Sequence, residues 1–211
     1  MVRWWMWLLL AIGLFLGLTG WAAYQFLIRP AQTLVEGFRQ VIALEAGVRA
    51  DPSFTPPADG RLSPGQLERF LAVQREVKQG LGPRYPQLEA RLEQLARQYA
   101  GQTTLDYRAV LDLFRGTGAL LPEAKRLQVE ALRAQGFSRE EYAWVRQQVY
   151  AALGYGLPQL DLEAILRQIA VRDFNPRVAL LRAEASEVNL ERVAPFGAEL
   201  LRYYPFTWFG L

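Results

Sequence analysis

Two groups of glutamates are the side chains whose spacing could support chemistry. In the first group, Glu184, Glu187 and Glu191 stand at positions i, i+3 and i+7, so they share one face of a helix. Carboxylates spaced in this way can bind a hard cation, or two metal ions if a second helix supplies a matching set. The sequence contains no second acidic cluster of that pattern. We therefore expect a solvated helix face and no metal site.

Glu140 and Glu141 form the second group. Hydrolysis of wall glycans can proceed on carboxylates alone, so this pair could serve an enzyme of that kind. The two acids also follow Ser138 and Arg139 in the order of a helix capping box, and acids in a first turn complement the helix dipole. We expect the structural role and keep a carboxylate-dependent envelope hydrolase as the alternative function.

Missing residue types exclude most other chemistry. The 211 residues include no cysteine and no histidine. The chain therefore has no thiolate nucleophile, disulfide or iron–sulfur ligand, and it lacks the commonest general base and metal ligand. Gly154-Tyr155-Gly156 lacks the further residues of a phosphate-binding loop. We predict a protein that is not an enzyme and that holds no cofactor.

The charged residues argue against a nucleic-acid partner. The formal net charge is +3, but acids and bases alternate along the chain. A nucleic-acid binder concentrates its basic residues on one face. The pattern instead predicts an ordinary solvated surface.

Residues 1–29 are predicted to be a transmembrane anchor. Residues 4–28 contain no charge, and about 20 apolar residues suffice to cross a bilayer. Amphipathic aromatic residues flank the run, as expected at the two membrane interfaces: Trp4, Trp5, Trp7, Trp21 and Tyr24. A cleaved signal peptide is the alternative, but residues 20–23 match a cleavage site poorly. We expect the segment to be retained, with the lipid bilayer as its partner.

The orientation follows from a default, because the positive charges on the two sides of the span nearly balance. Arg3 lies before it, and Arg29 and Arg39 lie after it. A bacterial signal-anchor with a short positive leader usually keeps its amino terminus inside. We therefore expect a single-pass protein of the inner (plasma) membrane with its helical domain on the extracytoplasmic side.

Small residues within the predicted span could mediate helix contact. Gly13 and Gly17 are four residues apart, and Gly20 lies one turn further on the same face. This spacing lets two membrane helices approach closely, within a dimer or a larger complex. Glycine is also common in membrane helices, so the spacing alone does not establish a contact.

The rest of the chain has helical periodicity. Arg29-Pro30 interrupts the first helix, and we expect a juxtamembrane helix over 30–50, a linker rich in Pro and Gly over 51–65, and a helical domain over 66–211. Ser63 and Gln66 form a capping box, and a last long helix is expected from Asn175-Pro176. No convincing alternating strand is found. We predict an all-α fold: one transmembrane helix and a compact bundle of six to eight short helices.

The aromatic carboxyl terminus is the most unusual part of this domain. Residues 203–209 contain five aromatic side chains and no charge. They could pack on their own domain, lie at the bilayer interface, or dock on a partner through Phe206, Trp208 and Phe209. Together these features favour a non-enzymatic accessory or scaffold subunit of a membrane complex, or an envelope interaction module, whose partners are other membrane proteins.

Overall fold

The computed structural model describes residues 14–15, 17–22, 24–25, 29–98, 117, 120–159, 163–164, 167–168, 171, 179–181 and 186–211. Contacts divide the chain into two compact units, residues 1–37 and 38–211. The domain boundaries expected from the sequence, at residues 30, 51 and 66, stay predictions.

The described residues of the N-terminal unit are helical. The helix α2 (Arg29–Ala46) begins in this unit and its second half belongs to the next one. Within the described residues, no helix combines the length and the apolar character that crossing a bilayer requires. Most of the predicted span, residues 4–28, lies outside those residues.

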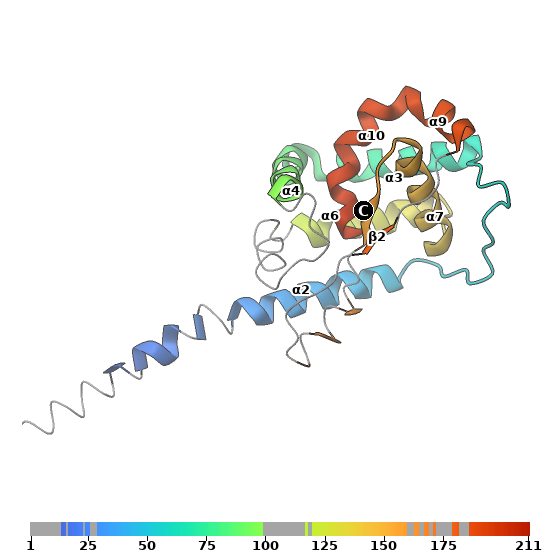
Figure 1. Cartoon of the computed structure of the whole chain (residues 1–211). Helices are drawn as coiled ribbons and strands as arrows, with labels where there is room; N and C mark the ends of the chain where they lie inside the picture. The colour runs from blue at the N-terminus through green and yellow to red at the C-terminus, as the bar shows by residue number, and fades with distance from the viewer. Residues whose placement is uncertain are drawn as a thin grey trace, which may run out of the picture. The chain divides into compact units, whose positions relative to one another are not determined.

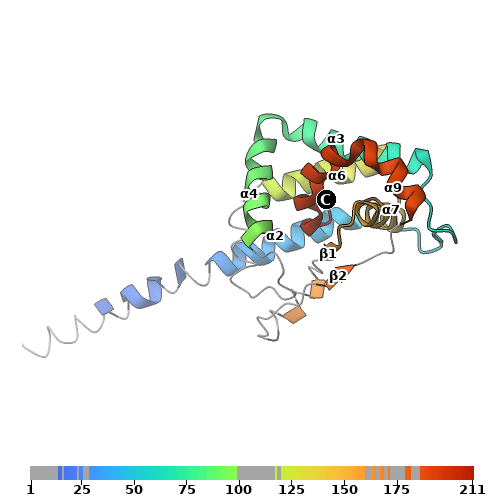
Figure 2. The same cartoon turned by 45° about the horizontal axis from the view of Figure 1, so that its top comes forward.

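The second unit is built mainly from helices, and the prediction of an all-α fold is confirmed. Helix α3 lies against both α6 and α7 (Figure 1, Figure 2). The described helices of this unit that follow α2 are α3 (Pro64–Leu81), α4 (Tyr85–Gln98), α6 (Leu120–Ala134), α7 (Arg139–Ala152), α9 (Glu187–Val193) and α10 (Gly197–Tyr203), with the 3-10 turns η2 (Gly82–Arg84), η3 (Ala194–Phe196) and η4 (Tyr204–Phe209).

A short strand pair was not predicted. Strand β1 (Leu157–Gln159) pairs antiparallel with β2 (Ala179–Leu181). The expectation of one long helix from Asn175 is therefore wrong at β2, and α9 begins only at Glu187. A short apolar run is compatible with the period of a helix and with that of a strand. Here the pairing with a distant segment determines that the run forms a strand.

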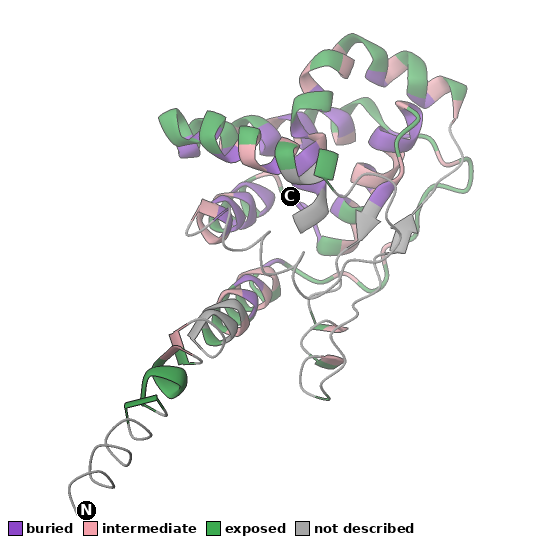
Figure 3. Cartoon of the chain, turned by 60° about the vertical axis from the view of Figure 1, so that its left-hand side comes forward, coloured by how far each residue is buried: buried purple, intermediate pink, exposed green. Residues whose placement is uncertain are grey.

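Helix α3 shows why the local sequence signals succeeded. Ser63 Oγ accepts a hydrogen bond from Gln66 N at 3.1 Å, and Gln66 Oε1 accepts one from Ser63 N at 3.0 Å. This capping box, with Pro64 in the first turn, confirms the predicted helix start. The apolar face of α3, with Phe70 and Val73 fully buried, packs in the core (Figure 3).

The segment between α2 and α3 follows a fixed course along the second unit. Val48 and Leu62 are buried in the core. The fully buried Asn189 of α9 accepts a hydrogen bond from Leu62 N at 2.8 Å and donates one to Gly60 O at 2.9 Å. A single amide side chain thus holds both polar groups of this turn.

Candidate functional site

The two acids considered for general acid chemistry have structural partners. The carboxylate of Glu140 accepts a hydrogen bond from Asp51 N at 2.6 Å, and this bond lowers the pKa of Glu140. Glu141 Oε1 lies 2.5 Å from Arg69 Nη2, so α7 is joined to α3. A general acid needs a raised pKa, which is the opposite of what Glu140 has.

The predicted cap of α7 is half formed. Ser138 Oγ accepts a hydrogen bond from Glu141 N at 3.1 Å, as expected. The Glu141 carboxylate, however, accepts from Gln66 Nε2 at 3.2 Å in addition to its contact with Arg69. A tertiary ion pair has replaced the second bond of the capping box.

Among the described residues, the acidic helix face shows no features of a metal site. Glu187 and Glu191 are exposed on α9, while Glu184 lies outside the described residues. The described part of the chain contains no group of three acidic side chains that could hold an ion.

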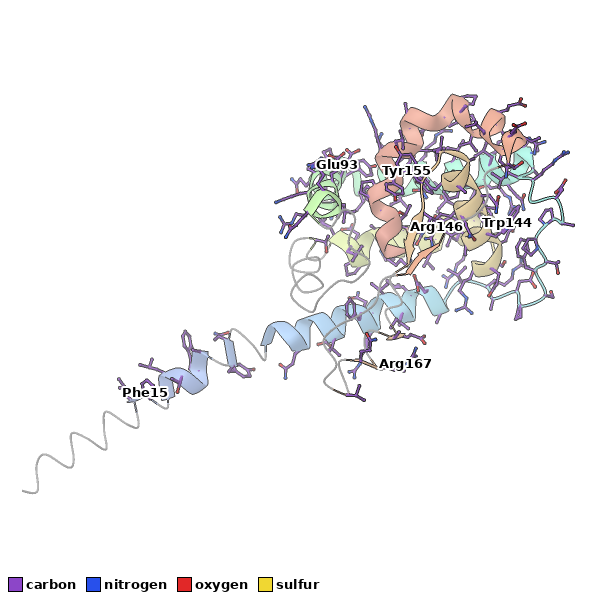
Figure 4. All side chains as sticks on the ribbon, viewed as in Figure 1. Phe15, Glu93, Trp144, Arg146, Tyr155 and Arg167 are labelled. Carbon is purple, nitrogen blue, oxygen red and sulfur yellow. The ribbon has the colours of Figure 1, made fainter. Side chains whose placement is uncertain are left out.

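The predicted membrane-facing residues are found only in part. Trp21 and Tyr24 are exposed, and around Gly17 and Gly20 an added Cβ would meet no atom within 4 Å. Phe15 likewise stands out from its helix (Figure 4). The other predicted positions lie outside the described residues: Gly13, Trp4, Trp5 and Trp7.

The aromatic carboxyl terminus packs on its own unit at Phe206. This side chain is 2% exposed, and its ring stacks on Tyr85 of α4 with centroids 5.3 Å apart and an interplanar angle of 6°. Tyr204 OH donates a hydrogen bond to Gly156 O at 2.7 Å. Phe206 thus follows the first of the three alternatives. The side chains of Trp208 and Phe209 lie outside the described residues.

A buried polar cluster surrounds the carbonyl of Gly210. We call it the lysine cluster; its members are Glu45, Gln74, Lys125, Gln128, Tyr142, Arg146 and Gly210. The side chain of Lys125 is 3% exposed and forms an ion pair with Glu45. Lys125 Nζ and Gln128 Nε2 both donate to Gly210 O, at 3.3 and 2.9 Å.

Amides and a phenol extend this cluster into the core. The Tyr142 hydroxyl accepts hydrogen bonds from Gln74 Nε2 at 3.0 Å and from Gln128 Nε2 at 3.1 Å. The guanidinium of Arg146 lies 5.8 Å from the centroid of the Tyr142 ring, and its Nε is buried without a partner in the described part. Arg146 and Trp144 point to opposite sides of α7 (Figure 4).

Burial sets the electrostatics of the lysine cluster. It lowers the pKa of Lys125, although Glu45 acts in the opposite direction, and it raises the pKa of Tyr142. Arg146 lowers the pKa of Lys125 further. The polar atoms contact one another and the tail, so this arrangement supports a structural role: it holds α2, α6, α7 and the tail together.

A second polar group is open to solvent. A groove of about 410 Å³, which we call the tyrosine groove, is lined by Arg75, Lys78, Gln79, Gly82, Tyr85, Pro86, Glu199 and Tyr203. Arg75 donates from Nε and Nη2 to the two oxygens of Glu199, each at 2.9 Å. This bidentate contact lowers the pKa of Glu199 and raises that of Arg75.

Two tyrosines form the aromatic wall of the groove. Tyr85 is 4% exposed, and its hydroxyl has no hydrogen-bond partner among the described residues. The ammonium of Lys78 lies 5.5 Å from the Tyr85 ring centroid. Tyr203 OH donates to Glu199 Oε1 at 3.4 Å, and burial is the main cause that raises the pKa of Tyr203 to about 12.

Sequence reasoning missed both polar groups. Lys125 lies four residues after Leu121 and four before Val129, so its spacing places it on the apolar stripe of its helix. Scarcity was another signal, because Lys78 and Lys125 are the only two lysines among 24 basic residues. A scan of known family models matched none, and searches of curated proteins and of solved structures found no similar chain.

Proposed function

We propose that this protein is anchored in a membrane by its N-terminal segment and acts as a non-enzymatic accessory or scaffold subunit of a membrane complex. The observation that carries the proposal is a set of large apolar side chains that are between 50% and 66% exposed: Leu14, Phe15, Leu18, Trp21 and Tyr24. Exposed apolar surface is unfavourable by about 25 cal/mol per Å². A bilayer would cover these side chains, and residues 4–28 carry no charge.

The membrane arrangement is part of the same proposal. The anchor crosses the inner membrane once, with the helical unit on the extracytoplasmic side. Gly13, Gly17 and Gly20 supply the close-approach face toward other membrane subunits. The compact second unit, with its ion pairs on the surface, suits a scaffold in water.

The positions of the carboxylates favour a scaffold over a hydrolase. Glycan hydrolysis on carboxylates requires two acids that flank a substrate, one with a raised pKa. Glu140 and Glu141 each hold a structural partner. The single acid that lines the tyrosine groove, Glu199, is paired with Arg75 and has a lowered pKa.

Membrane fractionation tests the anchor. The full-length protein should stay in the membrane pellet after alkaline extraction. The double variant Leu14→Arg/Leu18→Arg should move to the supernatant, because each buried arginine costs about 3 kcal/mol. The matched control is Leu190→Arg/Leu201→Arg, which alters exposed leucines of the second unit and should stay in the pellet.

Mass spectrometry gives a second, independent test. The retained protein should carry its full N-terminal segment. A mature amino terminus near Ala23 or Tyr24 would show a cleaved signal peptide and refute the anchor. Release of soluble sugar from purified wall glycan, lost in Glu199→Gln, would replace the scaffold by the hydrolase.

A further inference from the structure

We propose that the tyrosine groove is a binding site for a small organic carboxylate with a flat apolar body. The inference does not depend on membrane anchoring, since every lining residue belongs to the second unit. The volume of about 410 Å³ falls within the range of about 300–1,000 Å³ that is usual for ligand sites.

The charges in the groove favour an anion. Arg75 and Lys78 supply two positive charges, and Glu199 supplies one negative charge. Glu199 binds Nε and Nη2 of Arg75, which leaves Nη1 without a hydrogen-bond partner in the described part. The Lys78 ammonium likewise forms no ion pair there and lies over the Tyr85 ring. A carboxylate can therefore contact both cations while the Arg75–Glu199 pair stays intact.

The walls of the groove favour a flat apolar body next to that carboxylate. Tyr85 and Tyr203 lie with ring centroids 6.3 Å apart at an interplanar angle of 75°. Pro86 continues the wall, and an added Cβ at Gly82 would meet no atom within 4 Å, so this side of the groove is open. Phe206 stacks on the Tyr85 ring, so a planar ligand ring would meet the two tyrosines at their edges.

The Tyr85 hydroxyl lies beneath the surface of the groove. The residue is 4% exposed, it lines the groove, and its oxygen has no partner among the described residues. Buried hydroxyls are nearly always hydrogen-bonded, and an orphan one is unfavourable by about 1–3 kcal/mol. This oxygen is fully buried, so a carboxylate in the groove reaches the donor only if the Tyr85 side chain moves.

Benzoate is the probe, and Lys78 supplies the signal. Reductive methylation with ¹³C-formaldehyde should label the exposed Lys78 and the terminal amine of the full-length protein, while the buried Lys125 stays unmodified. Dimethylation keeps the charge of the amine. Benzoate should shift the Lys78 signal saturably and leave the terminal amine unchanged. Benzamide, which has the same shape without the charge, should produce no shift.

Three probe results would overturn the proposal. Equal shifts from benzoate and benzamide would show that charge is not recognised. Saturation by inorganic phosphate as strong as by benzoate would show that the apolar body is not recognised. Absence of any saturable benzoate shift would refute the site altogether.

Variants assign the binding to these residues. Calorimetric titration should give a benzoate affinity about tenfold weaker in Lys78→Gln, the size expected for a lost charge-assisted contact. Arg126→Gln removes an exposed cation of α6 and should leave the affinity unchanged. Unchanged affinity in Lys78→Gln, with its circular dichroism spectrum intact, would contradict the proposal.

Discussion

The lysine cluster and the tyrosine groove each contain an acid–base pair, but the two cations differ in burial. The side chain of Lys125 is 3% exposed and that of Arg75 is 48% exposed, whereas the two acids, Glu45 and Glu199, are similarly open at 43% and 32%. The pKa of Lys125 is lowered, because loss of water is the largest effect, and that of Arg75 is raised, because its bond to Glu199 is the largest. Exposure to water therefore decides whether the protein disfavours or favours the charged form.

The reactivity of the only two lysines should show this contrast most strongly. An acylating reagent reaches Lys78 in the native state, but it reaches Lys125 only after the cluster opens. Because opening of a core costs several kcal/mol, Lys125 should react about a thousandfold more slowly. Peptide mass spectrometry over time measures both rates. In denaturant the rates should become equal, and equal rates in the native protein would contradict the burial of Lys125.

Substitution of Lys125 separates the cost of a lost charge from that of a lost volume. Lys125→Ala leaves a cavity and removes the partner of Glu45, and should lower the free energy of unfolding by about 3 kcal/mol. For a unit of this size that corresponds to a fall in melting temperature of about 10 °C. Lys125→Met keeps the volume without a buried charge and should lose less than half as much. Thermal melts of the two full-length variants measure both losses. An equal loss of stability in Lys125→Ala and Lys125→Met would show that the lost charge, and not the lost volume, is responsible.

Gly210 tests how closely the tail approaches the lysine cluster. Its φ is +70°, and an added Cβ would lie 3.3 Å from Lys125 Nζ and 3.4 Å from Arg146 Nη1. Gly154 has a φ of +81° but nothing within 4 Å of an added Cβ. Both alanine variants should lose about 1–2 kcal/mol through the backbone. Gly210→Ala should lose more because of the crowding, and equal losses would show that the cluster tolerates a methyl group.

The smallest effect is expected from the Arg75–Glu199 pair, as a loss of stability in acid. The pKa of Glu199 is lowered in the fold, so its pairing with Arg75 stabilises the protein above pH 4.5, the ordinary value, and is lost as the pH falls through the folded value. The free energy of unfolding falls as the solution is acidified, and Glu199→Gln should make that fall smaller by less than about 1 kcal/mol, since solvent screens the pair. Melting temperatures measured between pH 7 and pH 3 give the dependence of stability on pH. Glu140, whose pKa is also lowered, should account for part of the pH dependence of stability that remains in this variant.

Local signals predicted well what lies close together along the chain. Ser63, Pro64 and Gln66 fixed the start of α3 because the capping bonds span three residues. The lysine cluster joins groups much further apart, such as Lys125 and Gly210, and no period or motif encodes that contact. The same applies to Ala179–Leu181, which became a strand through pairing with Leu157–Gln159. For the tail, the sequence left three alternatives: packing on its own domain, lying at the bilayer interface, or docking on a partner. The stacking of Phe206 on Tyr85, which the sequence does not encode, shows that Phe206 packs on its own domain.

The contacts made by α9 and α10 have a consequence for synthesis on the ribosome. Asn189 binds the backbone of Leu62, 127 residues earlier, and Glu199 binds Arg75, 124 residues earlier. Contacts between such distant positions slow folding, because a long loop must close before they form. While the chain emerges, the core must therefore remain incomplete until α9 and α10 supply Val193 and Leu200, near the end of the second unit. A nascent chain stalled before residue 186 should recruit chaperones through the core surface that Val193 and Leu200 would cover, whereas one stalled after residue 211 has left the exit tunnel should not.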